Sequence, residues 1–286
     1  MEANEQINAA FNFQSVILLP KAFPSKVLKW MKQNAKPKMA LKLMKVCKYF
    51  YYEDGFQYLV VKRLAYGDNK LAYSTLDDKR HEIDTLDSLP KKLWIVGWMA
   101  ILSVQCTAAS TLLLKTAICN IRKLQLTNQH ITLYEFMLLT DGGTIESCGI
   151  IKTVIKNDKD EIVPLEDICE CLPNAQRIDI GYEAPSIHSL KAAETKISSK
   201  LKQLELWISP VNNLGLLSLL SYMKKHQQIQ YKLWIIGVPP DQYTKDFAPF
   251  VDKVVQEWSA EYAPPSIIVT PTTFVPCRKS SIEKIL

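Results

Sequence analysis

The sequence predicts an α/β protein with a helical segment at its N-terminal end and alternating strands and helices after it. Two observations lead to this fold class. Short apolar strand patterns recur from Leu93 onward, and stretches with helical periodicity separate them. Before them, residues 23–50 place apolar and lysine side chains at helical spacing. The first pattern indicates a sheet built strand by strand, and the second indicates a separate helical element.

Seven strands are expected after Leu93, several with strict alternation such as Leu204, Leu206 and Ile208. They cover residues 93–96, 121–126, 145–151, 176–180, 201–208, 232–237 and 265–269. Helices are expected between them at residues 132–140, 165–173, 186–201, 215–226 and 246–258. Successive strands follow at steps of roughly 24–34 residues, near the spacing of leucine-rich repeats. The fold expected for this part is therefore an irregular leucine-rich-repeat-like solenoid rather than an open doubly wound sheet.

Four segments follow from this reading of the chain. Residues 1–22 form a leader, 23–64 a helical domain, 65–92 a linker, and 93–286 the repeat domain. Residues 65–92 are assigned to a linker because they are polar and acidic, with Asp77, Asp78 and Asp84 outside any apolar periodicity.

Composition fits a soluble protein of the cytoplasm or the nucleus. The 286 residues are 48% hydrophobic and 22% charged, which is ordinary for a globular protein. The start of the chain lacks a secretory pattern, and its seven cysteines form no C-x-x-C pair, so reduced thiols are expected. Leu93–Leu114 carries no charge and is long enough to span a bilayer. Its polar second half instead favours a buried strand followed by a helix, and no membrane contact is expected.

The chain shows no catalytic constellation. No glycine-rich phosphate-binding motif is present, and the four histidines lie far apart in the sequence. Cys169 and Cys171 sit in a helical pattern that turns one of them toward the core, so packing is favoured over metal binding. Residues 140–144 (TDGGT) and 157–161 (NDKDE) are expected to be turns. We therefore expect a binding protein, not an enzyme, with no cofactor and no metal.

Two short amphipathic helices are expected within residues 24–50. Pro24 starts the first, where Val27, Leu28 and Met31 share one side, and Pro37 ends it. The second carries a stripe at i, i+3, i+4, i+7 formed by Leu43, Val46, Cys47 and Phe50. Residues 21–50 hold nine lysines and no carboxylate, and the lysines take the opposite side of each helix. Helices this short need a cover for their apolar stripes, supplied by the chain or by a partner.

The segment FPSKVLKWMKQNAKPKMALKLMKVCKYF resembles an F-box over about 28 residues. The F-box pattern runs from Leu-Pro through a Val/Leu–Ile helix to Leu-x-x-Val-Cys-Lys-x-Phe. Lys26 stands where that pattern has an acidic residue, and Ala35 stands where it has a larger apolar one. The positions that match are Phe23, Pro24, Val27, Leu28, Met31, Leu41, Leu43, Val46, Cys47 and Phe50. The strand–helix remainder is similar to that of nematode F-box proteins with irregular leucine-rich-repeat-like C-terminal halves.

This resemblance implies a substrate-recognition receptor of an SCF-type (cullin–RING) ubiquitin ligase. The ten matching residues would then bind the adaptor subunit, and the repeat domain would bind a target protein of unknown identity. A first alternative is a repeat-type interaction protein whose helices are only an N-terminal cap. A second is a polyanion-binding protein, disfavoured because residues 21–50 contain no Arg for bidentate contacts with nucleic acid.

Overall fold

The computed structural model describes residues 24–35, 37–46, 50, 58–67, 70–181, 185–208, 213–237 and 248–270. The chain divides into two compact units, Met1–Leu59 and Val60–Leu286. The described residues of the first unit include two helices, and the second unit contains a large sheet with the helices that cover it.

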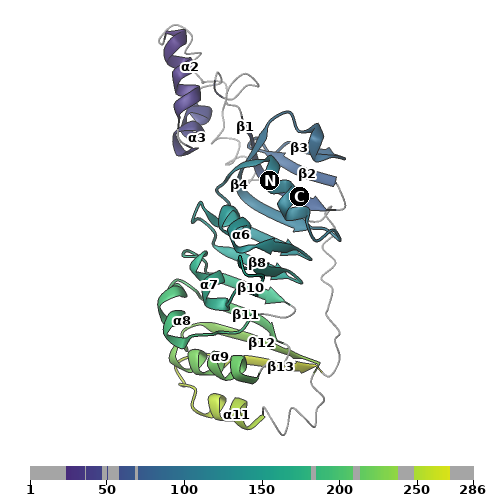
Figure 1. Ribbon diagram of the computed structural model, residues 1–286. Coiled ribbons are helices and arrows are strands. Elements are labelled where there is room, and N and C mark those ends of the chain that lie inside the picture. The colour runs from purple at the N-terminus through teal and green to yellow at the C-terminus, as the bar shows by residue number, and fades with distance from the viewer. Residues whose placement is uncertain are drawn as a thin grey trace, which may run out of the picture. The chain divides into compact units, whose positions relative to one another are not determined.

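The helical unit consists of α2, Ser25–Asn34, and α3, Pro37–Val46 (Figure 1). The carbonyl of Pro24 accepts hydrogen bonds from the amides of Val27 and Leu28 at 2.9 and 3.2 Å, and these bonds close the first turn of α2. Proline at the start of α3 has no amide hydrogen to leave without a partner. The two prolines therefore set where each helix begins.

The second unit is built on a sheet of 11 strands within the described residues. Seven of them run parallel and lie side by side in chain order (Figure 1). They are β4 (Lys92–Leu102), β6 (Lys123–Thr127), β8 (Ser147–Ile151), β10 (Arg177–Gly181), β11 (Gln203–Ile208), β12 (Gln230–Ile236) and β13 (Ser266–Thr270). Within this row each inner strand therefore pairs with the row members that precede and follow it along the chain.

The other strands of the sheet lie at its β4 end. An antiparallel set continues the sheet beyond β4, made of β1 (Tyr58–Gly67), β2 (Lys70–Thr75) and β3 (Arg80–Ile83). A short strand, β5 (Thr116–Cys119), pairs with the first part of β4, and β6 pairs with its last part. A separate parallel pair is formed by β7 (His130–Thr132) and β9 (Val154–Lys156).

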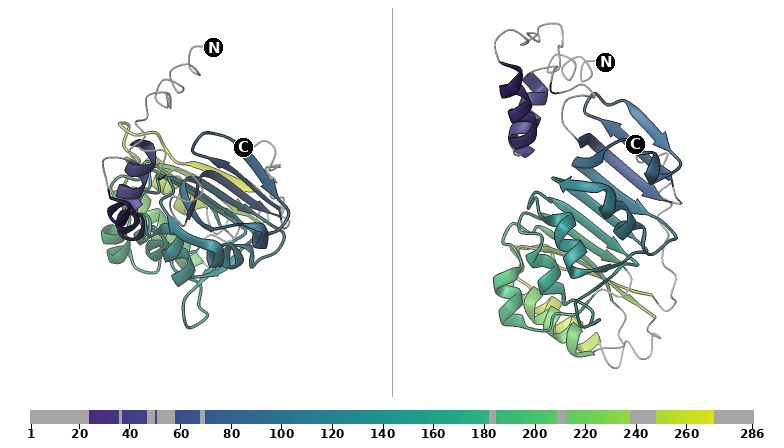
Figure 2. Two further views of the ribbon diagram at one scale, coloured as in Figure 1. Left: turned by 90° about the horizontal axis from the view of Figure 1, so that it is seen from above. Right: turned by 45° about the horizontal axis from the view of Figure 1, so that its top comes forward.

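Helices connect the parallel strands and lie along one side of them (Figures 1 and 2). They are α5 (Ala108–Lys115), α6 (Leu133–Thr140), α7 (Leu165–Glu170), α8 (Leu190–Lys196), α9 (Asn213–Lys225) and α11 (Ala248–Gln256). The strands present alternate side chains to this side. One row of register partners is buried throughout and comprises Met99, Leu124, Cys148, Ile178, Leu204 and Tyr231. A second such row comprises Ile101, Leu126, Ile150, Ile180, Leu206 and Leu233. These rows form the core between sheet and helices.

Two buried polar side chains hold neighbouring strand–helix units together. The Gln129 amide nitrogen donates to the carbonyls of Gln105, Thr127 and Asn128, and its oxygen accepts from the amide of Ala109 at 2.8 Å. Gln129 is fully buried, so its amide group is satisfied only by these backbone groups. Glu166 on α7 is also buried, and it accepts the amides of His188 and Ser189 just before α8.

The predicted α/β class and all seven predicted strands are confirmed. The five helices expected between them are also present. Leu93–Leu114 forms a strand and a helix, as expected, and none of the described helices is long and apolar enough to cross a membrane. Both predicted turns are present, with Gly143 at φ 57° in the first and Asp160 at φ 65° in the second.

Two boundary predictions differ from the structure. The helical domain was expected to reach residue 64, but Tyr58–Gly67 is a strand in which Val60, Val61 and Leu64 are buried. Residues 65–92 were expected to form a linker, but they contain β2 and β3 and belong to the sheet unit. The acidic residues that suggested a linker are exposed: Asp77 and Asp78 lie in the turn after Thr75, and Asp84 lies directly after β3. Acidic side chains at an exposed sheet edge are compatible with strand pairing.

Candidate functional site

Helix α2 separates its side chains into a covered and an exposed side. Leu28 is buried and Met31 is half-buried, whereas Val27 is 38% exposed and Trp30 is 64% exposed. Val27 and Trp30 are three residues apart and therefore neighbours on the helix surface. The sequence prediction placed Val27 on the side of Leu28, but the structure puts it at the exposed edge beside Trp30.

Helix α3 has the same arrangement. Ala40 and Met44 are buried, Leu43 is half-buried, and Met39 is 52% exposed. Phe50, after the helix, is 2% exposed. Exposed apolar side chains of this size on two neighbouring helices are candidates for contact with another protein.

The ten predicted adaptor-binding residues fall into four groups. Leu28 and Phe50 are buried within the chain, and Met31 and Leu43 are partly covered. Pro24 and Val27 are exposed. The remaining four positions lie outside the described residues or side chains, and they are Phe23, Leu41, Val46 and Cys47. The sequence analysis did not predict Trp30 and Met39 as binding residues. Trp30 could have been predicted, because it lies three residues after Val27 and therefore next to it on a helix.

The face of the parallel sheet that points away from the core rows carries a charged cluster around Glu205. Its side chain is 3% exposed and accepts a hydrogen bond from Trp234 Nε1 at 3.0 Å. Lys232 Nζ lies 3.3 Å and Arg177 Nη2 lies 3.7 Å from its carboxylate oxygens. The same Lys232 nitrogen lies 4.8 Å from the centre of the Trp234 ring. Three adjacent strands therefore share one buried carboxylate.

Two tryptophans continue this face next to the Glu205 cluster. Trp207 and Trp234 are register partners on β11 and β12, with ring centroids 5.3 Å apart. Trp207 packs over Gly181 on β10, where an added Cβ would lie 3.7 Å from the indole. Tryptophan is enriched in protein-binding surfaces, so this pair marks the sheet face as a candidate surface.

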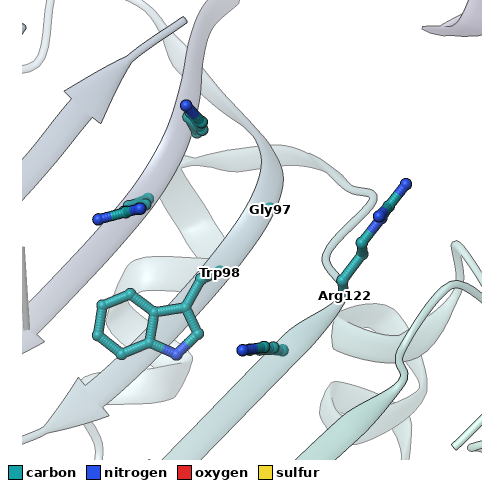
Figure 3. Close-up of a pocket in the computed structure, with 6 residues that line it drawn as sticks. Gly97, Trp98 and Arg122 are labelled. Carbon is teal, nitrogen blue, oxygen red and sulfur yellow. The ribbon is translucent and has the colours of Figure 1, made fainter. Parts of the chain in front are cut away.

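A hollow of about 470 Å³ lies at the junction of β1, β4 and the start of β6. It is lined by Lys62, Arg63, Gly97, Trp98, Arg122 and Lys123. Figure 3 shows the indole of Trp98 projecting from β4 and the Arg122 side chain on the neighbouring segment, with Gly97 next to Trp98. Four cationic residues and one tryptophan therefore line one depression.

The backbone at this hollow departs from regular strand geometry. Val61 pairs with Thr75 and Arg63 with Ser74, so Lys62 is the extra residue of a β-bulge. Gly97 lies against this bulge, because a Cβ at Gly97 would come within 2.3 Å of the Lys62 carbonyl oxygen. The bulge and the glycine together allow β1 and β4 to approach here.

Lys62 and Arg122 of this lining form ion pairs. Lys62 Nζ contacts both carboxylate oxygens of Asp78 at 2.8 Å. Arg122 Nε lies 3.9 Å from a carboxylate oxygen of Glu146. Lys123 is exposed and forms no ion pair with any described residue. These residues were not predicted as a site, because they come from three strands and form no sequence motif.

Two buried cysteines lie in environments that suppress thiolate formation. Burial raises the pKa of the Cys119 thiol and that of the Cys169 thiol to about 12. One member of the pair was predicted to face the core, and it is Cys169, since Cys171 is only half-buried. Among the described residues, no group of three or more His, Cys, Asp or Glu side chains is arranged to hold a metal ion.

No protein-family model matches the chain, and no curated protein matches it. The resemblance to an F-box therefore depends on the residues of the helical segment alone.

Proposed function

We propose that this protein is the substrate-recognition receptor of an SCF-type (cullin–RING) ubiquitin ligase. In this proposal α2 and α3 bind the adaptor subunit as a divergent F-box. The strand–helix unit, a leucine-rich-repeat-like domain, binds a target protein through the sheet face that carries Glu205 and Trp234. The observation that carries the proposal is the set of exposed apolar side chains on the two helices, Val27, Trp30 and Met39.

The energetics are consistent with partner binding by this surface. Burying three such side chains contributes roughly 1.5–3 kcal/mol each. Association itself costs about 4–15 kcal/mol, so stable binding needs additional contacts around these three. The exposed lysines Lys26, Lys29 and Lys42 surround them, and they would accelerate association with an acidic adaptor.

The test is co-elution of the full-length chain with purified adaptor subunit in size-exclusion chromatography. We expect a complex with the natural sequence and its loss in Val27→Asp and Trp30→Asp. Both side chains are exposed, so both variants are expected to remain folded. Gln33→Asp adds the same charge at an exposed polar position of α2 and serves as the matched control. Absence of a complex with the natural sequence at about 10 μM, a concentration well above a stable complex's Kd, would refute the proposal.

A second candidate is a repeat-type interaction protein that binds no ligase adaptor. The buried positions Leu28, Ala40, Met44 and Phe50 favour it, because one side of the helices is already covered within the chain. In that case Leu28→Asp unfolds the helical unit, and Val27→Asp changes neither folding nor any complex. Circular dichroism of the two variants, measured beside the co-elution experiment, separates the candidates.

A further inference from the structure

We propose that the hollow at Lys62, Gly97, Trp98 and Lys123 binds a nucleoside phosphate, with its base on the indole of Trp98 and its phosphate at Lys123. This site is independent of the ligase proposal, because it lies entirely within the sheet unit.

The placement of Trp98 and Lys123 supports a ligand with a ring and an anionic group. These two residues are register partners on β4 and β6, so their side chains lie side by side on the same face of the sheet. An indole beside an ammonium offers a stacking surface next to a positive charge. Bases stack on aromatic side chains irrespective of their sequence, and lysine binds phosphate as a point charge.

The charge of the lining favours an anion over a neutral ligand. Lys62, Arg63, Arg122 and Lys123 bring four positive charges. Asp78 pairs with Lys62 and Glu146 pairs with Arg122, whereas Lys123 has no ion-pair partner in the described part of the chain. A phosphate monoester carries a charge of about −1.5 to −2 at pH 7. Its binding beside Lys123 would neutralise a charge that the described residues leave unpaired.

The size of the hollow favours a whole nucleotide over a smaller anion. Pockets for small molecules and cofactors commonly measure about 300–1,000 Å³. The volume of about 470 Å³ falls within this range and exceeds what a phosphate group alone would fill.

The backbone geometry indicates a preformed site. The β-bulge at Lys62 shapes the β1 wall of the hollow, and the Lys62 ammonium binds Asp78 in the turn between β2 and β3. Bulges are over-represented beside binding and active sites because they redirect a side chain. The close approach of Gly97 to Lys62 holds the two strands that form this part of the wall.

The experiment is isothermal titration calorimetry of the full-length protein with AMP at low salt. Adenosine, inorganic phosphate and O-phosphotyrosine serve as comparison ligands. We expect AMP to bind in the micromolar range, with adenosine and phosphate each at least about tenfold weaker, because each lacks one of the two contacts. Tighter binding of O-phosphotyrosine than of AMP would overturn the nucleotide assignment.

Two variants test whether AMP binds in this hollow, and a third variant serves as the control. Trp98→Leu and Lys123→Gln are each expected to weaken AMP binding by about tenfold, since one removes the stacking surface and the other the phosphate contact. Lys202→Gln removes an exposed lysine next to the start of β11 and is the matched control, with no expected change. Circular dichroism must show the natural fold for each variant. The proposal fails if AMP does not bind at 1 mM, a concentration about tenfold above the weakest expected Kd. It also fails if all three variants bind AMP as the natural protein does.

Discussion

Replacing Glu205 by alanine tests whether the charged cluster of the sheet face stabilises the strand–helix unit. The side chain is 3% exposed and meets Trp234, Lys232 and Arg177. Loss of the Trp234 hydrogen bond to a charged acceptor should cost about 1.5–3 kcal/mol. The two ion pairs should add about 0.5 kcal/mol each, because Lys232 and Arg177 are 33% and 42% exposed and solvent screens them. The expected total is about 2.5–4 kcal/mol.

Urea unfolding followed by circular dichroism measures this loss. With a slope of about 3 kcal/mol per molar, the midpoint should fall by roughly 1 M in Glu205→Ala. Glu205→Gln keeps an oxygen for the Trp234 N–H and should lose about half as much. The control is Glu146→Ala, whose carboxylate is 48% exposed and 3.9 Å from Arg122, with a change below about 0.5 kcal/mol. Equal midpoints for Glu205→Ala and Glu146→Ala would refute the reasoning.

Three further predictions concern the sheet unit. Gln129→Ala should destabilise the fold by about 2–4 kcal/mol in urea unfolding, because the buried amide of Ala109 and three carbonyls lose their partner; a loss below about 1 kcal/mol would contradict it. Gly97→Ala should lower the free energy of unfolding by about 1–3 kcal/mol, because its Cβ would meet the Lys62 carbonyl. Gly149→Ala, whose Cβ would lie 3.9 Å from Gln125, should change the urea midpoint little. Burial raises the folded-state pKa of the Cys119 and Cys169 thiols from 9.0 to about 12, so their contribution to stability is complete below pH 9 and lost as pH rises toward 12. At pH 8 iodoacetamide should therefore alkylate the half-buried Cys106 before Cys119 or Cys169 in the folded protein, and equal rates would contradict the assigned burial.

The periodicity of the sequence was sufficient to predict the parallel strands. In β10 and β11 the alternating residues Ile178, Ile180, Leu204 and Leu206 are the ones that reach the core. When every second residue of a strand is buried against a layer of helices, apolar residues recur at every second position of the sequence. The connecting helices were predictable for the same reason, since their apolar residues face the same core.

The antiparallel strands and the hollow could not be predicted from a pattern of this kind. In β1 the buried residues Val60, Val61, Leu64 and Ala65 follow each other at spacings that also suit a helix, so the helical reading extended too far. The hollow depends on a bulge at Lys62 and on the close approach of Gly97, 35 residues later in the chain. A glycine within a strand pattern is the one local signal of such an approach, and it does not identify the opposite strand.

The chain-order pairing of the parallel strands has a consequence for how the protein folds. Lys123 pairs with Ser147 and Ser147 with Arg177, so these contacts close loops of only 24 and 30 residues. The entropic cost of loop closure is therefore small and similar at each step. Formation of one strand–helix unit provides the edge on which the next can assemble, and folding can spread outward from any stable pair. Hydrogen exchange should accordingly be fastest at the β13 edge and slowest near β8 and β10, in the interior of the row.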